Sequence, residues 1–203
     1  MSDTKENILF AALRLFAQDG YEAVSVSEIA GALGMTKGAL YKHYKSKRDI
    51  FDSIVARMER LDAEHAQQYE LPEGTFGEME DAYRRATIKQ MTEFSCAQFR
   101  YWTEEAFPSM FRKMLTLEQY RSTEMQSLYQ QYLVAGPLGY VTDLFSSWNI
   151  ADAHKRAIEF YAPMFLFYSM YDCAGDKRVA AAELGEYMRN ICEKWNGEKL
   201  QNE

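Results

Sequence analysis

The sequence predicts an all-α protein with an N-terminal helix-turn-helix domain and a larger C-terminal helical domain. Apolar residues recur at intervals of three and four along the chain, which is the spacing of one face of an α-helix. No stretch shows the sustained alternation of a β-strand between hairpin turns. The 203 residues include 4 prolines and are 47% hydrophobic, a composition typical of an ordered, helix-rich globular protein.

The N-terminal segment predicts three helices in close succession. The first is expected over residues 4–18. Ser25 and Glu28 form the capping pattern Ser-x-x-Glu, which begins a second helix. Thr36 can cap a third helix, and Gly34 allows the tight turn between the second and the third. The spacing therefore predicts a helix-turn-helix domain over residues 1–47.

A second domain is expected over residues 48–203. Its first helix, residues 47–68, follows another capping pattern, Ser46 with Asp49, and links the two domains. A Pro/Gly-containing loop over residues 70–77 comes next. A helical stripe continues over residues 76–94.

Further breaks are expected at Pro108, at Gly136-Pro137 and at Gly175-Asp176, which divide the remainder into about five helices. The last two, residues 150–174 and 179–195, form a predicted antiparallel hairpin with unusually apolar faces. Pro163 lies inside the first of them and should kink it or remove a backbone hydrogen bond.

Charge is unevenly distributed along the chain. Residues 1–60 contain 9 Lys and Arg against 8 Asp and Glu, whereas residues 61–203 contain 14 against 22. Residues 36–48 include five basic residues and no acidic one. A run of this kind on its own is often a solvated helix face, but beside a helix-turn-helix it predicts a surface that binds nucleic acid.

The third helix should present Lys37, Gly38, Tyr41 and Lys42 outward, over a small core that contains Leu33 and Leu40. Lysine can donate hydrogen bonds to guanine, and glycine permits close approach of the backbone. Amide groups at the starts of helices, near Ser27, Lys37 and Lys47, are natural phosphate ligands, and Lys45 adds positive charge.

The segment from Ser25 to Phe51 resembles the signature of the TetR family of transcriptional regulators. The resemblance rests on Ile29-Ala30, Leu33-Gly34, and the ungapped run Met35-Thr36-Lys37-Gly38-Ala39-Leu40-Tyr41-Lys42-His43-Tyr44. With the preceding helix it covers about residues 5–55. Beyond them the chain shares only length and helical character with the family.

The resemblance implies a DNA interface with named roles. Lys37 and Gly38 should meet base edges in the major groove, and Lys42 can contact bases or phosphates. Tyr41, His43 and Lys47 should contact phosphates. The complete predicted interface consists of Ser25, Ser27, Thr36, Lys37, Gly38, Tyr41, Lys42, His43, Lys45 and Lys47.

One short recognition helix reads only a few base pairs, so we expect a homodimer on a palindromic operator of double-stranded DNA. The C-terminal hairpin is the expected interface, as it is in the family, although it can instead close the core of its own chain. The interface residues are Ala157, Ile158, Tyr161, Phe165 and Tyr168 opposite Ala181, Leu184, Tyr187, Met188 and Ile191.

The central helices are dense in aromatic residues and methionine, which line ligand pockets and also fill ordinary cores. We expect a small, largely apolar or aromatic effector there, with tyrosine hydroxyls, Gln98 or Gln119 orienting it. The candidate ligand residues are Phe99, Trp102, Met110, Met114, Tyr120, Tyr129, Met164 and Tyr168. Effector binding would release a repressor from DNA.

Other functions have less support in the sequence. The chain has no Gly-rich phosphate loop and no catalytic or metal-binding motif, so we expect neither an enzyme nor a cofactor or metal site. An architectural or ligand-independent DNA-binding protein, or an activator, are the alternatives to a ligand-responsive repressor. No apolar run is long enough to span a bilayer and no signal peptide is recognisable, so we expect a cytoplasmic protein. Cys96, Cys173 and Cys192 should be buried, reduced thiols.

Overall fold

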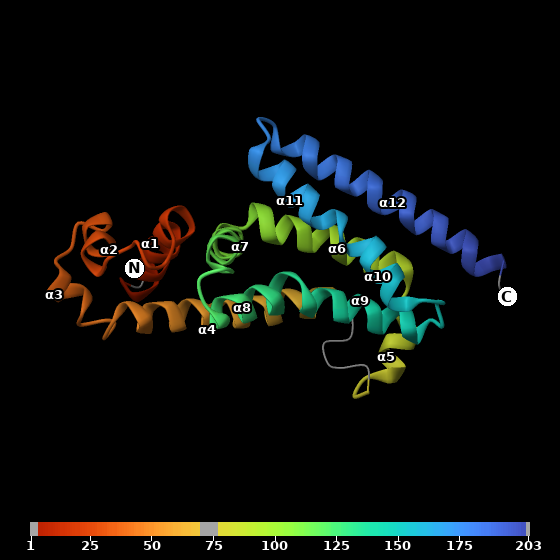
Figure 1. The fold of residues 1–203 in the computed structure, drawn as a ribbon, viewed down its shortest axis with the longest axis horizontal. Helices are drawn as coiled ribbons and strands as arrows, with labels where there is room; N and C mark the ends of the chain where they lie inside the picture. The colour runs from red at the N-terminus through yellow and green to blue at the C-terminus, as the bar shows by residue number, and fades with distance from the viewer. Residues whose placement is uncertain (1–3, 70–76, 202–203) are drawn as a thin grey trace. The chain divides into compact units, whose positions relative to one another are not determined.

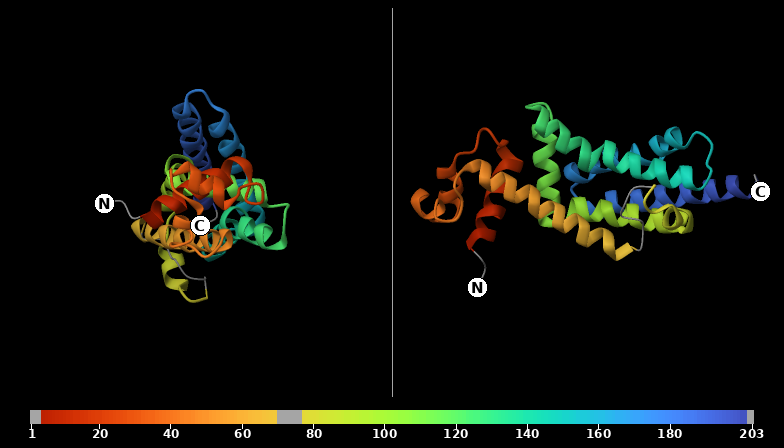
Figure 2. Two further views of the ribbon diagram at one scale, coloured as in Figure 1. Left: turned by 90° about the vertical axis from the view of Figure 1, so that its left-hand side faces the viewer. Right: turned by 90° about the horizontal axis from the view of Figure 1, so that it is seen from below.

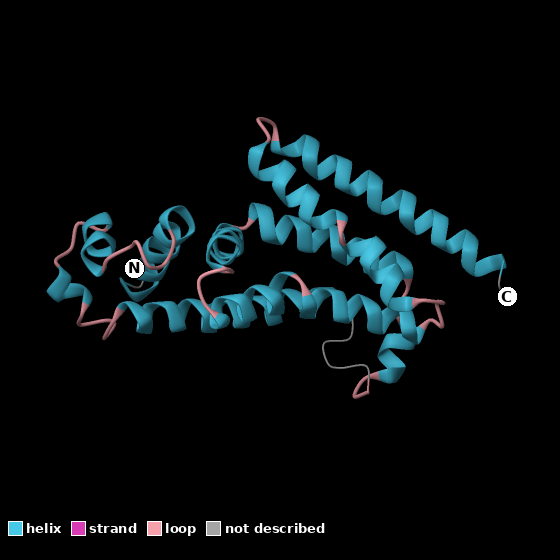
Figure 3. Cartoon of the chain, viewed as in Figure 1, coloured by secondary structure: helices cyan, strands magenta, loops and turns pink. Residues whose placement is uncertain are grey.

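The computed structural model describes residues 4–69 and 77–201, with side chains over 4–68 and 77–194. These residues form helices and no strand (Figures 1 and 3), which confirms the all-α prediction. None of the described helices is long and apolar enough to cross a bilayer. The helices are α1 (Thr4–Asp19), α2 (Val26–Ala32), α3 (Lys37–Leu40), α4 (Lys47–Ala66, followed by a 3-10 turn at Gln67–Tyr69), α5 (Glu80–Arg85), α6 (Ile88–Glu104), α7 (Ala106–Glu118), α8 (Thr123–Leu133), α9 (Ala135–Ser147), α10 (Ala153–Tyr161), α11 (Pro163–Cys173) and α12 (Lys177–Gln201).

The chain forms two compact units, and each is built from two separate stretches of sequence. Unit 1 contains residues 1–64 and 106–130, and unit 2 contains residues 65–105 and 131–203. The helix-turn-helix segment thus shares a core with α7 and the first part of α8, which follow it in the chain by more than forty residues.

Unit 1 is built on the packing of α1 against α7 (Figure 2). The ring of Phe10 meets that of Phe107 edge to face, with 5.4 Å between centroids. Apolar residues of α1, α4 and α7 recur at helical spacing, and their burial supplies the main stabilisation of the unit. The fully buried members include Ile8, Leu13, Phe16, Phe51, Ile54, Met58 and Phe111.

Unit 2 is built from α6 packed on α11 and α12, and from α9 packed on α5 and α10. Phe99 of α6 stacks on Tyr168 of α11 with 5.4 Å between ring centroids, and Phe145 of α9 meets Phe160 of α10 edge to face at 6.1 Å. Offset or edge-to-face aromatic pairs of this kind add to the gain from apolar burial.

The region predicted as one helical stripe over residues 76–94 contains two helices, α5 and the first part of α6. The prediction of a continuous helix there is therefore wrong. Thr87 begins α6 with a capping box: its Oγ1 accepts a hydrogen bond from the Gln90 amide at 3.1 Å, and Gln90 Oε1 accepts one from the Thr87 amide at 2.9 Å. The pattern Thr-x-x-Gln marks a helix start in the sequence. Phe76 and the loop predicted over residues 70–77 lie outside the described residues, except for Gly77.

The long helix predicted over residues 150–174 is also divided in two. Pro163 is the first residue of α11, where its missing amide hydrogen costs nothing, and α10 ends at Tyr161. The expected kink inside one continuous helix is therefore replaced by a boundary between two helices. Pro108 and Pro137 each lie in the first turn of a helix, so the helix boundaries precede them. The prediction of about five helices was too low.

The three cysteines are free thiols. Cys96 and Cys192 are half-buried, but Cys173 is exposed, so its predicted burial is wrong. Cys173 ends α11 at the turn into α12, where a short connection leaves the side chain uncovered.

Candidate nucleic-acid interface

Helix α2 begins with the capping box expected from the sequence. Ser25 Oγ accepts a hydrogen bond from the Glu28 amide at 3.2 Å, and Glu28 Oε2 accepts one from the Ser25 amide at 2.7 Å. These bonds hold the pKa of the Glu28 carboxyl below its usual value, because they stabilise the ionised form. Ser27 lies exposed in the first turn of α2.

The turn between α2 and α3 requires a glycine. Gly34 has a φ of +64°, a backbone conformation that residues other than glycine rarely adopt. The Gly34 amide donates to the Gly31 carbonyl at 3.0 Å, and the Met35 amide donates to the Ala30 carbonyl at 3.0 Å. The turn therefore fixes the direction in which α3 leaves α2.

Helix α3 is short and is held from one side. Thr36 Oγ1 accepts a hydrogen bond from the Ala39 amide at 3.1 Å, and Leu40 is completely buried. The opposite face is exposed: it carries Lys37, Gly38, Tyr41 and Lys42. The outward face predicted from the sequence is thus the one that faces solvent.

Gly38 has no role in packing that the structure shows. A Cβ atom added at this position would meet no atom of the protein within 4 Å. Glycine in a helix costs about 1 kcal/mol relative to alanine, so its presence in α3 is not explained by crowding inside the unit. An absent side chain on an exposed helix face leaves room for the close approach of another molecule.

The five basic residues of the segment from 36 to 48 fall into two groups. Lys37, Lys42 and Lys45 are exposed, and within the described residues their ammonium groups form no ion pair. The Lys37 ammonium lies 5.8 Å from the centroid of the Tyr41 ring. These three lysines carry positive charge that no acidic group of the described chain neutralises.

Lys47 and Arg48 are engaged within unit 1. The Lys47 ammonium donates to the Tyr21 carbonyl at 2.8 Å and to the Glu22 carbonyl at 3.3 Å, and it lies 4.3 Å from the Tyr21 ring centroid. Arg48 pairs with Asp52 and forms a two-bond pair with Glu124 of α8, at 2.6 and 2.8 Å. Sequence spacing carries no signal for either contact with Tyr21 or Glu124, because the partners are distant in the chain.

The remaining predicted DNA residues lie between α3 and α4. His43 is half-buried and its amide donates to the Leu40 carbonyl at 2.9 Å. Ser46 Oγ accepts a hydrogen bond from the Asp49 amide at 3.0 Å, while the Asp49 carboxylate accepts one from the Lys45 amide at 2.8 Å. Ser46 thus caps α4 as the pattern predicts, but the Asp49 carboxylate holds the Lys45 amide, one residue before the amide that a capping box uses.

A buried carboxylate, which the sequence analysis did not single out, supports the entry to the helix-turn-helix. Glu118, at the last residue of α7, is 1% exposed. Its Oε1 accepts a hydrogen bond from the Tyr21 amide at 3.0 Å. A Cβ atom at Gly20, whose φ is +85°, would lie 2.6 Å from the same oxygen, so this glycine allows the carboxylate to reach the backbone.

The candidate ligand residues are divided between the two units. In unit 2, Phe99, Trp102, Met164 and Tyr168 are buried. In unit 1, Met114 is buried and Met110 and Tyr129 are half-buried. Tyr120 is 89% exposed, so its predicted place in a pocket is wrong: it lies in the turn between α7 and α8, where nothing covers the ring.

Unit 2 contains buried oxygen atoms without a hydrogen bond. Within the described residues, Gln98 Oε1 on α6 and the Tyr140 hydroxyl on α9 are buried and have no hydrogen-bond partner. Tyr140 lies among aromatic rings, 5.8 Å from Tyr83 and 6.3 Å from Phe94 between centroids. Burial is the main cause that raises the pKa of Tyr140, so its hydroxyl stays protonated and can donate. Gln119, the other predicted polar group, donates to the Thr116 carbonyl within unit 1.

Comparison with known proteins places the helix-turn-helix in a family. Residues 8–54 match the family described as bacterial regulatory proteins, tetR family. The chain is 40% identical over 82 residues to the HTH-type transcriptional regulator AcrR of Shigella flexneri, covering 40% of this chain and 32% of that protein. It is 43% identical over 56 residues to the HTH-type transcriptional repressor BepR of Brucella suis, covering 28% and 27%. The matches thus span about a third or less of these relatives.

The fold extends the likeness beyond the matched segment. The solved structure of SmeT, the repressor of the Stenotrophomonas maltophilia multidrug efflux pump SmeDEF, aligns with a TM-score of 0.57 over 94% of this chain and 90% of that one. The sequence identity is 19%, so this likeness concerns the fold. These relatives are named as a transcriptional regulator and a transcriptional repressor. Residues 8–54 of the chain are therefore similar to the TetR family of bacterial regulatory proteins.

Proposed function

We propose that the chain is a transcriptional regulator that binds a palindromic DNA operator as a homodimer and responds to a small effector. It would act in the cytoplasm, where bacterial DNA is found. The observation that carries the proposal is the exposed face of α3, where Gly38 leaves open space between cationic side chains. A face of this size and charge fits the major groove.

The contacts proposed for each residue follow the exposure of its side chain. Lys37, Gly38 and Lys42 face outward from α3 and are assigned to base edges, with Lys42 also able to reach a phosphate. Tyr41, Lys45 and His43 are assigned to phosphates, together with the N-terminal turn of α2 at Ser25 and Ser27. Thr36 caps α3, the helix that carries the residues assigned to the bases.

Lys47 is assigned to DNA through its backbone. Its ammonium is held by the carbonyls of Tyr21 and Glu22, which leaves the amide at the start of α4 as the proposed phosphate ligand. The ammonium then acts by holding the segment between α1 and α2 against α4.

Exposed apolar side chains in and near the hairpin of α11 and α12 support the proposal of a dimer. Of the residues predicted for the interface, Ala157, Tyr168, Leu184 and Met188 are buried within their own chain. Other apolar side chains of the hairpin region remain exposed: Ile158 at 44%, Leu166 at 61%, Met170 at 36% and Val179 at 53%. Exposed apolar side chains favour burial in a protein interface, and we assign these four to contacts with a second copy of the chain.

The interior of unit 2 supports effector binding. Buried polar atoms are nearly always hydrogen-bonded in folded proteins, and Gln98 Oε1 and the Tyr140 hydroxyl have no partner in the described chain. We propose that they orient a largely aromatic or apolar effector that offers one hydrogen-bond donor and one acceptor. Its binding would favour one arrangement of the dimer over another and release a repressor from DNA.

Selection from a pool of random duplexes tests the DNA-binding proposal. The full chain should enrich a palindrome whose half-sites are about one helical turn, roughly 34–36 Å, apart or a multiple of it. Gel filtration with light scattering tests the dimer: Leu166→Glu should give a monomer that binds the selected duplex weakly, and Glu183→Ala, at an exposed polar position of α12, should leave the dimer intact. Enrichment of no sequence, or a dimeric Leu166→Glu variant, would count against the respective proposal.

A further inference from the structure

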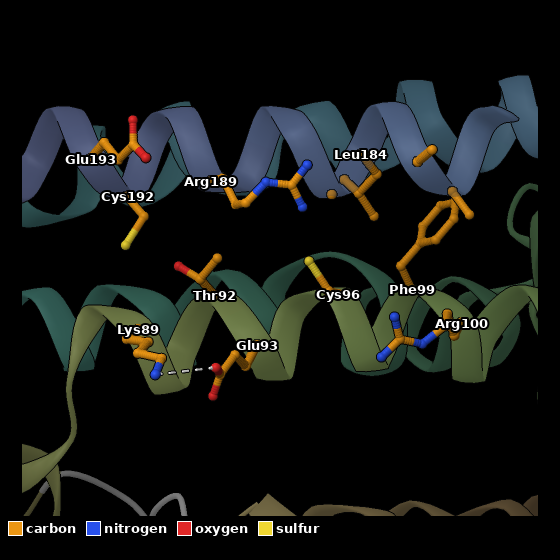
Figure 4. Close-up of a pocket in the computed structure, with 13 residues that line it drawn as sticks. Lys89, Thr92, Glu93, Cys96, Phe99, Arg100, Leu184, Arg189, Cys192 and Glu193 are labelled. Atoms are coloured by element: carbon orange, nitrogen blue, oxygen red, sulfur yellow. Dashed lines mark ion pairs between the residues drawn. The ribbon is translucent and has the colours of Figure 1, made fainter. Parts of the chain in front are cut away.

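A cleft of about 670 Å³ lies between α6 and α12 of unit 2 (Figure 4). This volume is within the range of roughly 300–1,000 Å³ of small-molecule sites. The cleft is separate from the polar atoms Gln98 Oε1 and Tyr140 Oη, because neither residue lines it. Its described lining comes from two helices only, so its chemistry can be examined one helix at a time.

Apolar side chains form part of the lining. Phe99 of α6, itself 1% exposed, faces Leu184 of α12, which is also 1% exposed. Ala181 and Ala182 continue this surface on α12. Ala181 is half-buried and Ala182 is exposed, so an apolar body on this side of the cleft would remove their surface from water, which favours binding.

Two guanidinium groups stand beside this apolar surface. Arg189 comes from α12 and Arg100 from α6, and within the described residues neither forms an ion pair. In Figure 4 the Arg189 guanidinium lies between the two helices. Burial raises the pKa of the half-buried Cys96 thiol, and the positive charges of the two guanidiniums lower it. Both arginines therefore line the cleft that Cys96 also lines.

The acidic lining residues do not neutralise these arginines. Glu93 pairs with Lys89, with 3.8 Å between the ammonium and the carboxylate. In Figure 4 the Glu193 carboxylate points away from α6, near Cys192 and apart from Arg100. The cleft thus combines two uncompensated cations with an apolar wall.

We propose that this cleft binds an amphipathic anion, with Arg189 and Arg100 on a carboxylate or phosphate head and the Phe99–Leu184 surface on its apolar body. Guanidinium groups match both kinds of head by paired hydrogen bonds. An inorganic anion would leave most of the cleft unfilled. The site depends neither on DNA binding nor on the effector proposed for the interior of unit 2.

Calorimetric titration of the full chain tests the proposal with octanoate and octyl phosphate below their micellar concentrations. At least one of them should bind saturably with one site per chain, and the comparison identifies the preferred head group. Octanol and octyltrimethylammonium, which share the tail, should bind at least about tenfold more weakly, the factor expected for one charge-assisted contact.

Variants assign the head group to the two arginines. Arg189→Ala and Arg100→Ala should each weaken binding of the anion about tenfold or more. Arg178→Ala is the matched control, because Arg178 lies on α12 outside the cleft and pairs with Asp176. Gln98→Leu should leave binding unchanged, which separates this site from the interior one. Octanol that binds as tightly as octanoate, or arginine variants that bind like the native chain, would overturn the proposal.

Thiol labelling gives a readout in the native chain without any substitution. The bound anion should slow alkylation of Cys96 and Cys192 by N-ethylmaleimide, because both line the cleft. Cys173 is exposed and lies outside the lining, so its labelling rate should not change. Equal labelling of all three cysteines with and without a saturating anion would place the anion elsewhere.

Discussion

The buried Glu118 carboxylate accepts a hydrogen bond from the Tyr21 amide, with 3.0 Å between Oε1 and N. Glu118 ends α7, and Tyr21 lies in the segment that leads from α1 into α2. The two residues are 97 positions apart in the sequence. Together with the pair between Arg48 and Glu124, this bond joins the helix-turn-helix to α7 and α8 within unit 1. A shift of α7 would therefore also move the segment that leads into α2.

Glu118→Ala should destabilise unit 1 and weaken operator binding. The substitution leaves the Tyr21 amide without its acceptor and opens a cavity, with an expected cost of about 1–3 kcal/mol. Glu118→Gln retains an oxygen at the acceptor position and is expected to lose less. Chemical denaturation measures the free energy of unfolding of each variant. An alanine variant as stable as the native chain would show that the bond contributes nothing.

Gly38→Ala should separate stability from DNA binding. Alanine is favoured over glycine in a helix by about 1 kcal/mol, and the added methyl group meets no atom of the protein within 4 Å. The melting temperature should therefore stay level or rise, while affinity for the selected duplex falls. Gly139→Ala in α9, where an added Cβ also meets nothing, is the matched control and should not affect DNA binding. Equal affinities of the two variants would remove Gly38 from the interface.

Lys47→Ala should act through structure as well as through charge. It removes hydrogen bonds to the carbonyls of Tyr21 and Glu22, which lowers the free energy of unfolding by about 1–3 kcal/mol. Lys42→Ala, at an exposed position of the same basic segment, should leave stability unchanged and reduce the salt dependence of DNA binding by about one phosphate contact. Thermal denaturation and binding titrations at several salt concentrations check both. A fully stable Lys47→Ala variant would contradict the assigned role.

The carboxyl of Asp62 should make stability depend on pH. Burial raises its pKa from 3.8 to about 6, and its Oδ1 has no hydrogen bond in the described chain. Between these values the folded chain holds more protons than the unfolded chain, so stability is lost as the pH rises, by about 3 kcal/mol in total.

Asp62→Asn removes this titration, so its stability relative to the native chain should increase from pH 4 to pH 6 and then level off. Glu59→Gln, an exposed position on the same helix, should show no such trend. Urea denaturation at a series of pH values provides the measurement. A difference between Asp62→Asn and the native chain that is constant with pH would contradict the buried carboxyl.

Much of the N-terminal fold follows from local sequence. The capping box at Ser25, the cap at Ser46, the positive φ of Gly34 and the outward face of α3 are all determined within a few residues. Capping patterns and apolar periodicity in the sequence predict them. The pattern Thr-x-x-Gln also indicates the helix boundary at Thr87, although the apolar residues continue at helical spacing across it.

Other features depend on contacts between distant segments. Nothing near Lys47 in the sequence shows that its ammonium faces two carbonyls, and nothing near Glu118 shows a backbone amide 97 positions away. Tyr120 lies in a region rich in aromatic residues, which favours a place in a pocket, yet its ring is 89% exposed. Composition identifies residues that can line a pocket, but tertiary packing decides which of them are covered.

The most direct test of the central claim is methylation protection of guanine N7 on the selected operator. If α3 lies in the major groove with Lys37 on a base edge, the native chain should protect guanines symmetrically in the two half-sites, because N7 faces that groove. Lys37→Ala, compared at a concentration that saturates the duplex, should lose protection at one position in each half-site and retain it elsewhere. An absence of protection by the native chain, or the same pattern with both proteins, would contradict the assignment of α3 to base recognition.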